Sequence, residues 1–136
     1  MDLRKPLGYY TDDSSLRFHL LSVGEGLMTL IVFPNNQVML FDCNVTSDNE
    51  TEILEYLKTA IPAVHNPETE KEEQPIHAFV NSHRDDDHLR GLRKVNASFP
   101  IQTIWDSGQR EFCALLYYKL FSTFGLGGRP RLRLGC

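Results

Sequence analysis

The chain has 136 residues, of which 41% are hydrophobic and 24% are charged, and its formal net charge at pH 7 is −4. This is an ordinary globular composition, which excludes collagen-like, low-complexity and mostly disordered proteins. The negative charge provides no overall attraction to nucleic acids or anionic membranes. No apolar run approaches the roughly 20 residues of a membrane span, and Met1 to Lys5 lead into polar sequence rather than a secretory signal. We therefore expect a soluble cytoplasmic protein without a membrane segment.

The first elements expected along the chain are three antiparallel strands. Residues 1–16 are polar and are expected to form an irregular N-terminal segment. Strands follow at 17–23, 27–33 and 37–42, and glycine-rich and Pro-Asn-Asn turns separate them. This spacing predicts a three-stranded antiparallel meander.

Helices and strands alternate in the rest of the chain. Ser47 and Glu50 form a predicted capping box, and the helix that follows ends at Pro62. Residues 63–75 carry an acidic run and are predicted to be a surface loop. The sequence then predicts a strand buried on both faces at 76–81, a short helix at 89–95, a strand at 101–105 and a helix at 111–124.

These elements indicate one layered α/β (α+β) domain over residues 17–124. Residues 125–136 form a Gly/Arg-rich tail in which glycine and proline are expected to prevent regular structure. The three cysteines are widely spaced and include no CxxC, so we expect two buried thiols and one terminal thiol rather than disulfides. Three isolated histidines are expected to be packing or surface residues: His19, His65 and His77.

One polar stretch carries the candidate chemistry. Residues 82–88 contain two imidazoles and three aspartates directly after a predicted strand, where α/β folds commonly place their sites. A divalent cation would offset the repulsion among these carboxylates and keep the histidines neutral as ligands. Two such ions could share a water, acidify it to hydroxide and stabilise a developing oxyanion. The mixed His/Asp set favours Zn²⁺, with Mn²⁺ or Mg²⁺ as alternatives.

The stretch His83-Arg84-Asp85-Asp86-Asp87-His88 resembles the H-x-[HD]-x-D-H signature of the metallo-β-lactamase-fold hydrolases. Asp stands in place of the second histidine, as in the hydrolase domain of DNA-internalisation competence proteins. The glycines around Glu25, the strand that ends at Asp42 and the segment Asp106-Ser107-Gly108 are also similar to that group. The resemblance covers roughly residues 17–108.

The resemblance implies a role for each residue of the motif. His83 and Asp85 would bind the first metal ion, and Asp87 and His88 would bind the second. Asp87 would also be catalytic, because it would orient the attacking water. Asp42 would hydrogen-bond the loop that carries the ligands, as carboxylates behind metal ligands commonly do. An aspartate that simply ends a strand at a turn is the alternative for Asp42.

The family fold is an αβ/βα sandwich of two similar halves, and this chain would represent the N-terminal half, with a mixed sheet and helices on one face. The second half supplies the other ligands, whereas after Asp106 this sequence has no histidine and Glu111 as its only acid. The implied activity is attack of metal-bound hydroxide on an ester, with a small-molecule or nucleic-acid phosphodiester as the favoured substrate. The alternative is a truncated, inactive half-domain that acts as an interaction module, pairing with the missing half or with another copy.

Overall fold

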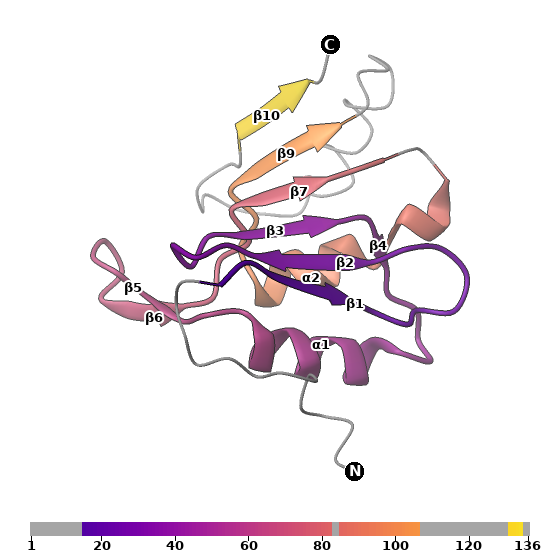
Figure 1. Ribbon diagram of the computed structural model, residues 1–136, viewed down its shortest axis with the longest axis horizontal. Coiled ribbons are helices and arrows are strands. Elements are labelled where there is room, and N and C mark those ends of the chain that lie inside the picture. Colours follow the sequence, from indigo (N-terminus) through magenta and orange to yellow (C-terminus); the bar gives the residue numbers. More distant parts are fainter. Residues whose placement is uncertain (1–14, 83–84, 107–130, 135–136) are drawn as a thin grey trace.

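The computed structural model describes residues 15–82, 85–106 and 131–134. Their main element is a mixed sheet with the strand order β1-β2-β3-β7-β9-β10 (Figure 1). β1, β2 and β3 pair antiparallel, which confirms the predicted meander, and β3, β7, β9 and β10 pair in parallel. Together with the two α-helices in the described part of the chain, this sheet makes a mixed α+β fold. The strands are β1 Arg17–Leu20, β2 Thr29–Val32, β3 Val38–Phe41, β7 Ala78–Val80, β9 Thr103–Asp106 and β10 Arg131–Leu134.

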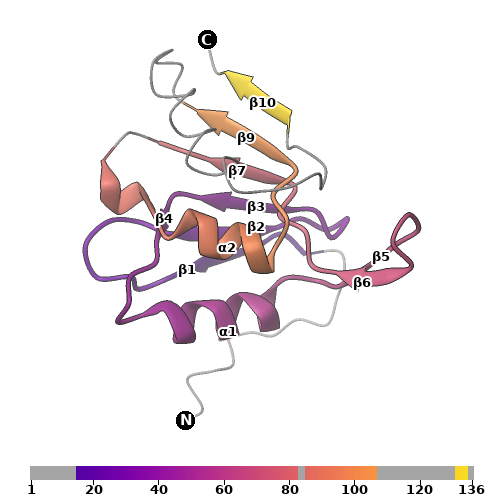
Figure 2. The same cartoon turned by 180° about the vertical axis from the view of Figure 1, so that it is seen from behind.

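Two helices pack against one face of this sheet. They are α1, Glu50–Ala60, and α2, Leu92–Ser98. α2 lies behind the strands in Figure 1 and in front of them in Figure 2. The sheet residues on this side are in register across four strands and fully or almost fully buried: Leu30, Leu40, Phe79 and Ile104. The core thus lies between the helices and one face of the sheet.

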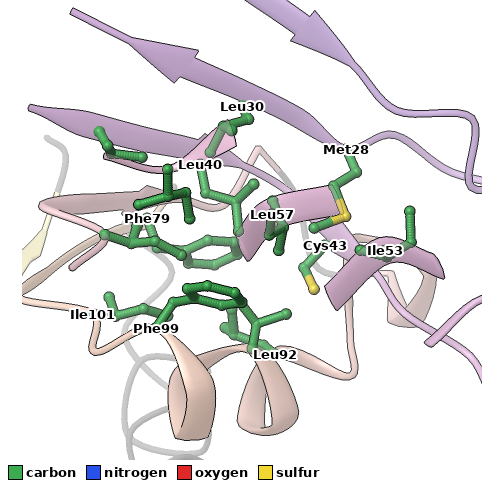
Figure 3. Close-up of a cluster of buried hydrophobic side chains, with 14 of the residues drawn as sticks. Met28, Leu30, Leu40, Cys43, Ile53, Leu57, Phe79, Leu92, Phe99 and Ile101 are labelled. Carbon is green, nitrogen blue, oxygen red and sulfur yellow. The ribbon is translucent and has the colours of Figure 1, made fainter. Parts of the chain in front are cut away.

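Figure 3 shows how the helices close this core. Side chains from the sheet meet Ile53 and Leu57 of α1 and Leu92 of α2, all of which are buried. Helical spacing produces this arrangement, because residues three or four positions apart share a face of the helix. His19 of β1 adds a polar contact to the same layer, since its Nδ1 lies 2.8 Å from the Tyr56 hydroxyl of α1.

The start of α1 differs from the prediction. The helix begins at Glu50 with Asn49 as its N-cap residue, so the predicted capping box from Ser47 is wrong. Ser47 Oγ instead donates to Asp48 Oδ1 at 3.1 Å. The backbone N–H of Thr46 donates to Asn49 Oδ1 at 2.8 Å. The local polar side chains therefore stabilise the turn before the helix rather than its first N–H groups.

Residues 63–75 form a hairpin rather than the predicted surface loop. β5, Val64–Asn66, pairs antiparallel with β6, Lys71–Glu73. Asn66 Nδ2 donates to Glu73 Oε2 at 3.0 Å, and Thr69 Oγ1 donates to Glu73 Oε1 at 2.9 Å. The Glu73 carboxylate on β6 thus accepts hydrogen bonds from β5 and from the turn between the two strands. The acidic run therefore belongs to a regular hairpin, although its sequence resembles a solvated loop. Both figures of the whole molecule show the hairpin beside the end of α1.

A second short pairing precedes α2. β4, Cys43–Asn44, pairs in parallel with β8, Leu89–Arg90. The predicted helix at 89–95 therefore starts later, at Leu92. Strands of two residues contain no hydrophobic period, so only the tertiary contact reveals them.

Two further predictions differ from the structure, one in the burial of a strand that does form and one in its secondary structure. The strand predicted at 76–81 is β7, and only its central Phe79 is fully buried, while Ala78 and Val80 are half-buried on the face away from the helices. The tail predicted to lack regular structure contains β10, which pairs in parallel with β9. The helix predicted at 111–124, together with Cys113 and Cys136, lies outside the described residues. Among the residues that are described, no helix is long and apolar enough to cross a membrane.

His77 extends the pairing between β7 and β3 through its side chain. Its backbone N–H donates to the Val38 carbonyl at 2.9 Å, and its Nδ1 accepts the Val38 N–H at 3.0 Å. A ring nitrogen accepts only while it is unprotonated. Burial lowers the pKa of His77 below its ordinary value of 6.5, which keeps the acceptor available. The residue therefore has a structural contact inside the sheet.

We expect the free energy of unfolding to fall as the pH drops below 6.5, the ordinary pKa of histidine, and through the lower pKa of folded His77. The sign follows because the unfolded chain binds this proton more readily than the folded chain. His77→Asn supplies an acceptor oxygen that does not titrate, so it should reduce this pH dependence. Urea unfolding between pH 7.5 and pH 5 measures it. His65→Asn, at an exposed histidine, is the control, and an equal pH dependence in wild type and His77→Asn would contradict the role of His77.

Candidate functional site

Polar side chains, most of them buried, gather where three parallel strands end. Asp42 follows β3, Asn81 and Ser82 follow β7, and Asp106 is the last residue of β9. Asp42, Asn81 and Asp106 are only 0%, 2% and 4% exposed. Since β3, β7 and β9 are parallel neighbours, their carboxyl ends lie at the same edge of the sheet. This is the edge at which α/β sheets bind ligands.

Hydrogen bonds connect these strand ends in two pairs. The Ser82 N–H donates to Asp42 Oδ1 at 2.7 Å, and the Ser82 hydroxyl donates to Asp42 Oδ2 at 2.6 Å. Asn81 Nδ2 donates to Asp106 Oδ1 at 2.9 Å. A buried carboxylate is costly unless its oxygens accept hydrogen bonds. Consecutive residues after β7 therefore stabilise the aspartates on the strands at either side.

Asp42 has an unusual backbone conformation. Its φ is +51°, in the left-handed region that most residues with a Cβ avoid. Aspartate and asparagine tolerate this region better than other residues. The Asp42 N–H donates to the Val80 carbonyl at 2.9 Å, which continues the β3–β7 pairing to this position. Two sets of contacts therefore stabilise the left-handed conformation of Asp42. Its backbone N–H bonds to β7, and its carboxylate accepts hydrogen bonds from Ser82 and His88.

The loop after β7 brings His88 onto Asp42. His88 closes the short 3-10 helix η1, Asp86–His88, and is buried. Its Nδ1 lies 2.8 Å from Asp42 Oδ2, although 46 residues separate the two in sequence. Because an ionised carboxylate only accepts, Nδ1 carries a hydrogen in this contact. Nε2 in turn lies 3.5 Å from Asp87 Oδ2.

A glycine turn packs on the other side of η1. Gly26 has a φ of +87°, and a Cβ at this position would lie 2.5 Å from the Asp87 carbonyl oxygen. Only glycine therefore allows the two backbones to approach this closely. Asn44 Nδ2 donates to the Glu25 carbonyl and so ties the turn to β4. The glycine turn and η1, separated by about 60 positions in the chain, form one packed unit.

The structure brings some of the predicted site residues together and leaves others apart or untested. Asp42, Asp87 and His88 form the contacts described above. Asp85 and Asp86 are exposed, and the Asp85 carbonyl accepts the His88 N–H at 3.0 Å. His83 lies outside the described residues, so its place in the predicted ligand set is not tested.

Among the residues that the structure describes, no group of three or more His, Cys, Asp or Glu side chains is arranged to hold a metal ion. The pair formed by His88 and Asp87 does fit two corners of such a site. Two donors that share a tetrahedral zinc ion at about 2.0–2.2 Å lie about 3.3–3.6 Å apart, and the observed separation of Nε2 and Oδ2 is 3.5 Å. The carboxylate behind Nδ1 is the partner that metal-ligating histidines usually have.

Cys43, next to Asp42 in sequence, is not suited to be a ligand. Its Sγ donates to the Arg90 carbonyl at 3.2 Å, and the side chain is fully buried. Burial raises the pKa of this thiol to about 12, so it stays protonated at neutral pH. The prediction of a buried, unpaired thiol is confirmed for this cysteine.

Sequence reasoning did not assign roles to Ser82 and Asn81, and it noted Asp106 without a contact. One signal was available for all three, because each is a polar residue at the end of a predicted apolar strand. What the pattern does not contain is the strand order. Ser82 reaches Asp42 and Asn81 reaches Asp106 because β7 lies between β3 and β9.

Comparisons with known proteins add no family assignment. No protein-family model matches the chain, and no curated protein matches it. The metallo-β-lactamase relationship therefore stays a hypothesis that rests on the motif.

We expect Asp42→Asn to lower the free energy of unfolding by about 2 kcal/mol, because a buried charged acceptor of three hydrogen bonds is lost. The amide also supplies a donor where Ser82 and His88 already donate. Urea unfolding measures the stability, and ¹⁵N spectra of the imidazole report which nitrogen of His88 carries the hydrogen. Asp48→Asn, at an exposed aspartate, should change neither. An unchanged stability and tautomer in Asp42→Asn would contradict the assigned contact.

Gly26→Ala should destabilise the chain more than Gly24→Ala. Both glycines have a positive φ, so each substitution should cost about 1 kcal/mol of conformational energy. A Cβ at Gly24 meets nothing within 4 Å, whereas a Cβ at Gly26 collides with Asp87. Thermal unfolding of the two variants isolates the collision, and equal losses of stability would show that Gly26 does not pack against η1.

Proposed function

We propose that this chain is a metal-dependent hydrolase of the metallo-β-lactamase type that cleaves an ester, with a phosphodiester as the favoured substrate. The observation that carries the proposal is the line of contacts from Asp42 through His88 to Asp87. A buried carboxylate orients an imidazole, and the opposite nitrogen of that imidazole faces a second, less buried carboxylate. Metal-binding histidines are commonly arranged in this way.

An alternative reading of these contacts is a purely structural hydrogen-bond network. Two features favour a site. The network lies at the carboxyl ends of three parallel strands, where ligand sites form. The loop also carries two further carboxylates at exposed positions, Asp85 before η1 and Asp86 as its first residue. A bound cation would offset the repulsion among these neighbouring carboxylates.

In this proposal His88 and Asp87 bind one ion, and His83 and Asp85 bind the other, as the motif suggests. When bound, zinc ions supply Lewis acidity that activates water and stabilises negative charge on the ester. Asp42 fixes the ring of His88 through Nδ1, and Ser82 donates two hydrogen bonds to the same carboxylate. Asp87 would also orient the attacking water. A small-molecule or nucleic-acid phosphodiester fits this chemistry, and a cytoplasmic location stays a prediction.

The second candidate from the sequence is an inactive half-domain that acts as an interaction module. Exposed apolar side chains on the sheet face opposite α1 and α2 favour it, namely Phe18, Leu20 and Trp105. The two functions differ in what the aspartates of η1 do, because an interaction module needs no ligand at Asp87.

The test compares Asp87→Asn with Asp86→Asn. Both remove one negative charge from η1, but only Asp87 lies beside His88 Nε2. We expect the wild-type chain, after loading with Zn²⁺ and dialysis, to retain one or two equivalents by elemental mass spectrometry and to hydrolyse bis(p-nitrophenyl) phosphate. Asp87→Asn should lose at least tenfold in both metal affinity and hydrolysis, while Asp86→Asn should stay within about twofold.

Two outcomes would reject the enzyme. One is a wild-type chain that retains no Zn²⁺ and no Mn²⁺. The other is hydrolysis that survives equally in both variants, since Asp87 would then have no role in the reaction. Circular dichroism of each variant shows that the fold is kept.

A further inference from the structure

A row of core residues in the main sheet ends in a histidine. In the register of the strands, His19 of β1 lies beside Leu30 of β2, and Leu30 lies beside Leu40 of β3. The row continues through Phe79 of β7 and Ile104 of β9. These four apolar side chains are buried, and His19 is only 9% exposed. A titratable side chain therefore occupies a core position at the edge of an otherwise apolar row.

His19 attaches β1 to the helix layer. Of the four residues of β1 it alone is buried, whereas Phe18 and Leu20 are exposed. Its Nδ1 lies 2.8 Å from the Tyr56 hydroxyl of α1, and the two rings meet edge to face with centroids 5.9 Å apart. Figures 1 and 2 both show β1 as the strand of the main sheet that runs beside α1. Because β1 is first in the strand order and pairs with β2 alone among the described strands, it can separate while the other strands stay paired.

The second ring nitrogen of His19, Nε2, is buried and has no hydrogen-bond partner in the part of the chain that the structure describes. A neutral imidazole carries one N–H group, whereas a protonated imidazole carries an N–H group on both nitrogens. Protonation in this position would leave a charged donor buried without an acceptor, which costs free energy. The contact between β1 and α1 therefore favours the neutral form of His19.

The groups around His19 come from three elements. On β1, Arg17 lies two residues away on the same face of the strand, and its positive charge opposes a second one. On α1, burial raises the pKa of Tyr56, which stays a neutral phenol. The charged residues within one turn of Tyr56 are exposed, and β2 contains no charged residue: the three on α1 are Glu52, Glu55 and Lys58. Burial, and after it the charge of Arg17, lowers the pKa of His19 below its ordinary value of 6.5.

We propose that the His19 contact is a pH-sensitive switch, which holds β1 against α1 at neutral pH and allows the strand to separate in mildly acidic solution. In the separated state β1 leaves both α1 and β2, and both imidazole nitrogens bind water. The proton stabilises this state, because the attached state offers it no acceptor. The other strands of the main sheet stay paired, and the switch involves none of the residues of the proposed metal site.

The two protonation states determine the sign and the size of the effect. A solvated histidine has its ordinary pKa of 6.5, whereas attached His19 has a lower pKa. Each pH unit below 6.5 at which attached His19 stays neutral favours the separated state by about tenfold. The attachment is therefore strongest above pH 6.5 and weakens as the pH falls from 6.5 to the lower pKa.

Native-state hydrogen exchange of the full chain, followed by NMR at individual amides, tests the switch. Each rate is divided by the rate of an unstructured peptide at the same pH, so that only the opening equilibrium remains. Between pH 7.5 and pH 5 we expect the protection of the amides that pair β1 with β2 to fall about tenfold. Low urea concentrations should hardly change their exchange at pH 5, because the separation of one strand exposes little surface. The amides of β3 and β7 should stay better protected and should respond to urea.

His19→Asn removes the titration and supplies an amide that can replace Nδ1 as the partner of the Tyr56 hydroxyl. In this variant the protection of β1 should not change with pH. His65→Asn is the same substitution at an exposed histidine and should keep the pH dependence of the wild type. In the wild-type chain the carbon shifts of the His19 imidazole report its pKa directly, and we expect a value below 6.5.

Each of the following results would overturn the proposal. Equal protection of β1 at pH 7.5 and pH 5 would mean that acid does not separate the strand. A loss of protection that persists in His19→Asn would come from another group. Exchange of β1 that rises with urea as steeply as exchange of β3 would report unfolding of the whole chain. A measured pKa of 6.5 or more for His19 would remove the driving force, and this result does not depend on any variant.

Discussion

The buried carboxylate of Asp42 is the group on which the candidate site depends. It is fully buried at the end of a central strand, and its desolvation is offset by the N–H and hydroxyl of Ser82 and by the imidazole of His88. These partners come from the end of β7 and from η1, so one charge connects the end of β3 to side chains 40 and 46 residues further along the chain. The site is therefore a consequence of a buried charge that has to be satisfied.

The sheet topology explains why those partners are available. β3, β7 and β9 are parallel, and parallel strands bring residues that follow them to one edge. At that edge Ser82 donates to Asp42, and Asn81 donates to Asp106. The glycine turn before β2 approaches the same loop from the opposite side, where Gly26 allows the backbone contact with Asp87. Fold stability and site geometry are thus coupled through the same few residues.

The metal-site proposal concerns the edge of the sheet, where polar side chains at the strand ends pair with one another. The described helices, α1 and α2, cover one face of the sheet, and the core lies between them and that face.

Hydrophobic periodicity and turn residues alone were enough to predict the antiparallel meander, the two described helices, the central strands and the polar loop after β7. Local signals failed where a tertiary contact decides the outcome. Asn49 rather than Ser47 precedes α1, the acidic run forms the β5–β6 hairpin, and the glycine-rich tail contributes β10. The pairing of Asp42 with Ser82 and His88 likewise belongs to the tertiary structure. Sequence specifies which residues are polar and where strands end, whereas the order of strands in the sheet decides which of those residues meet.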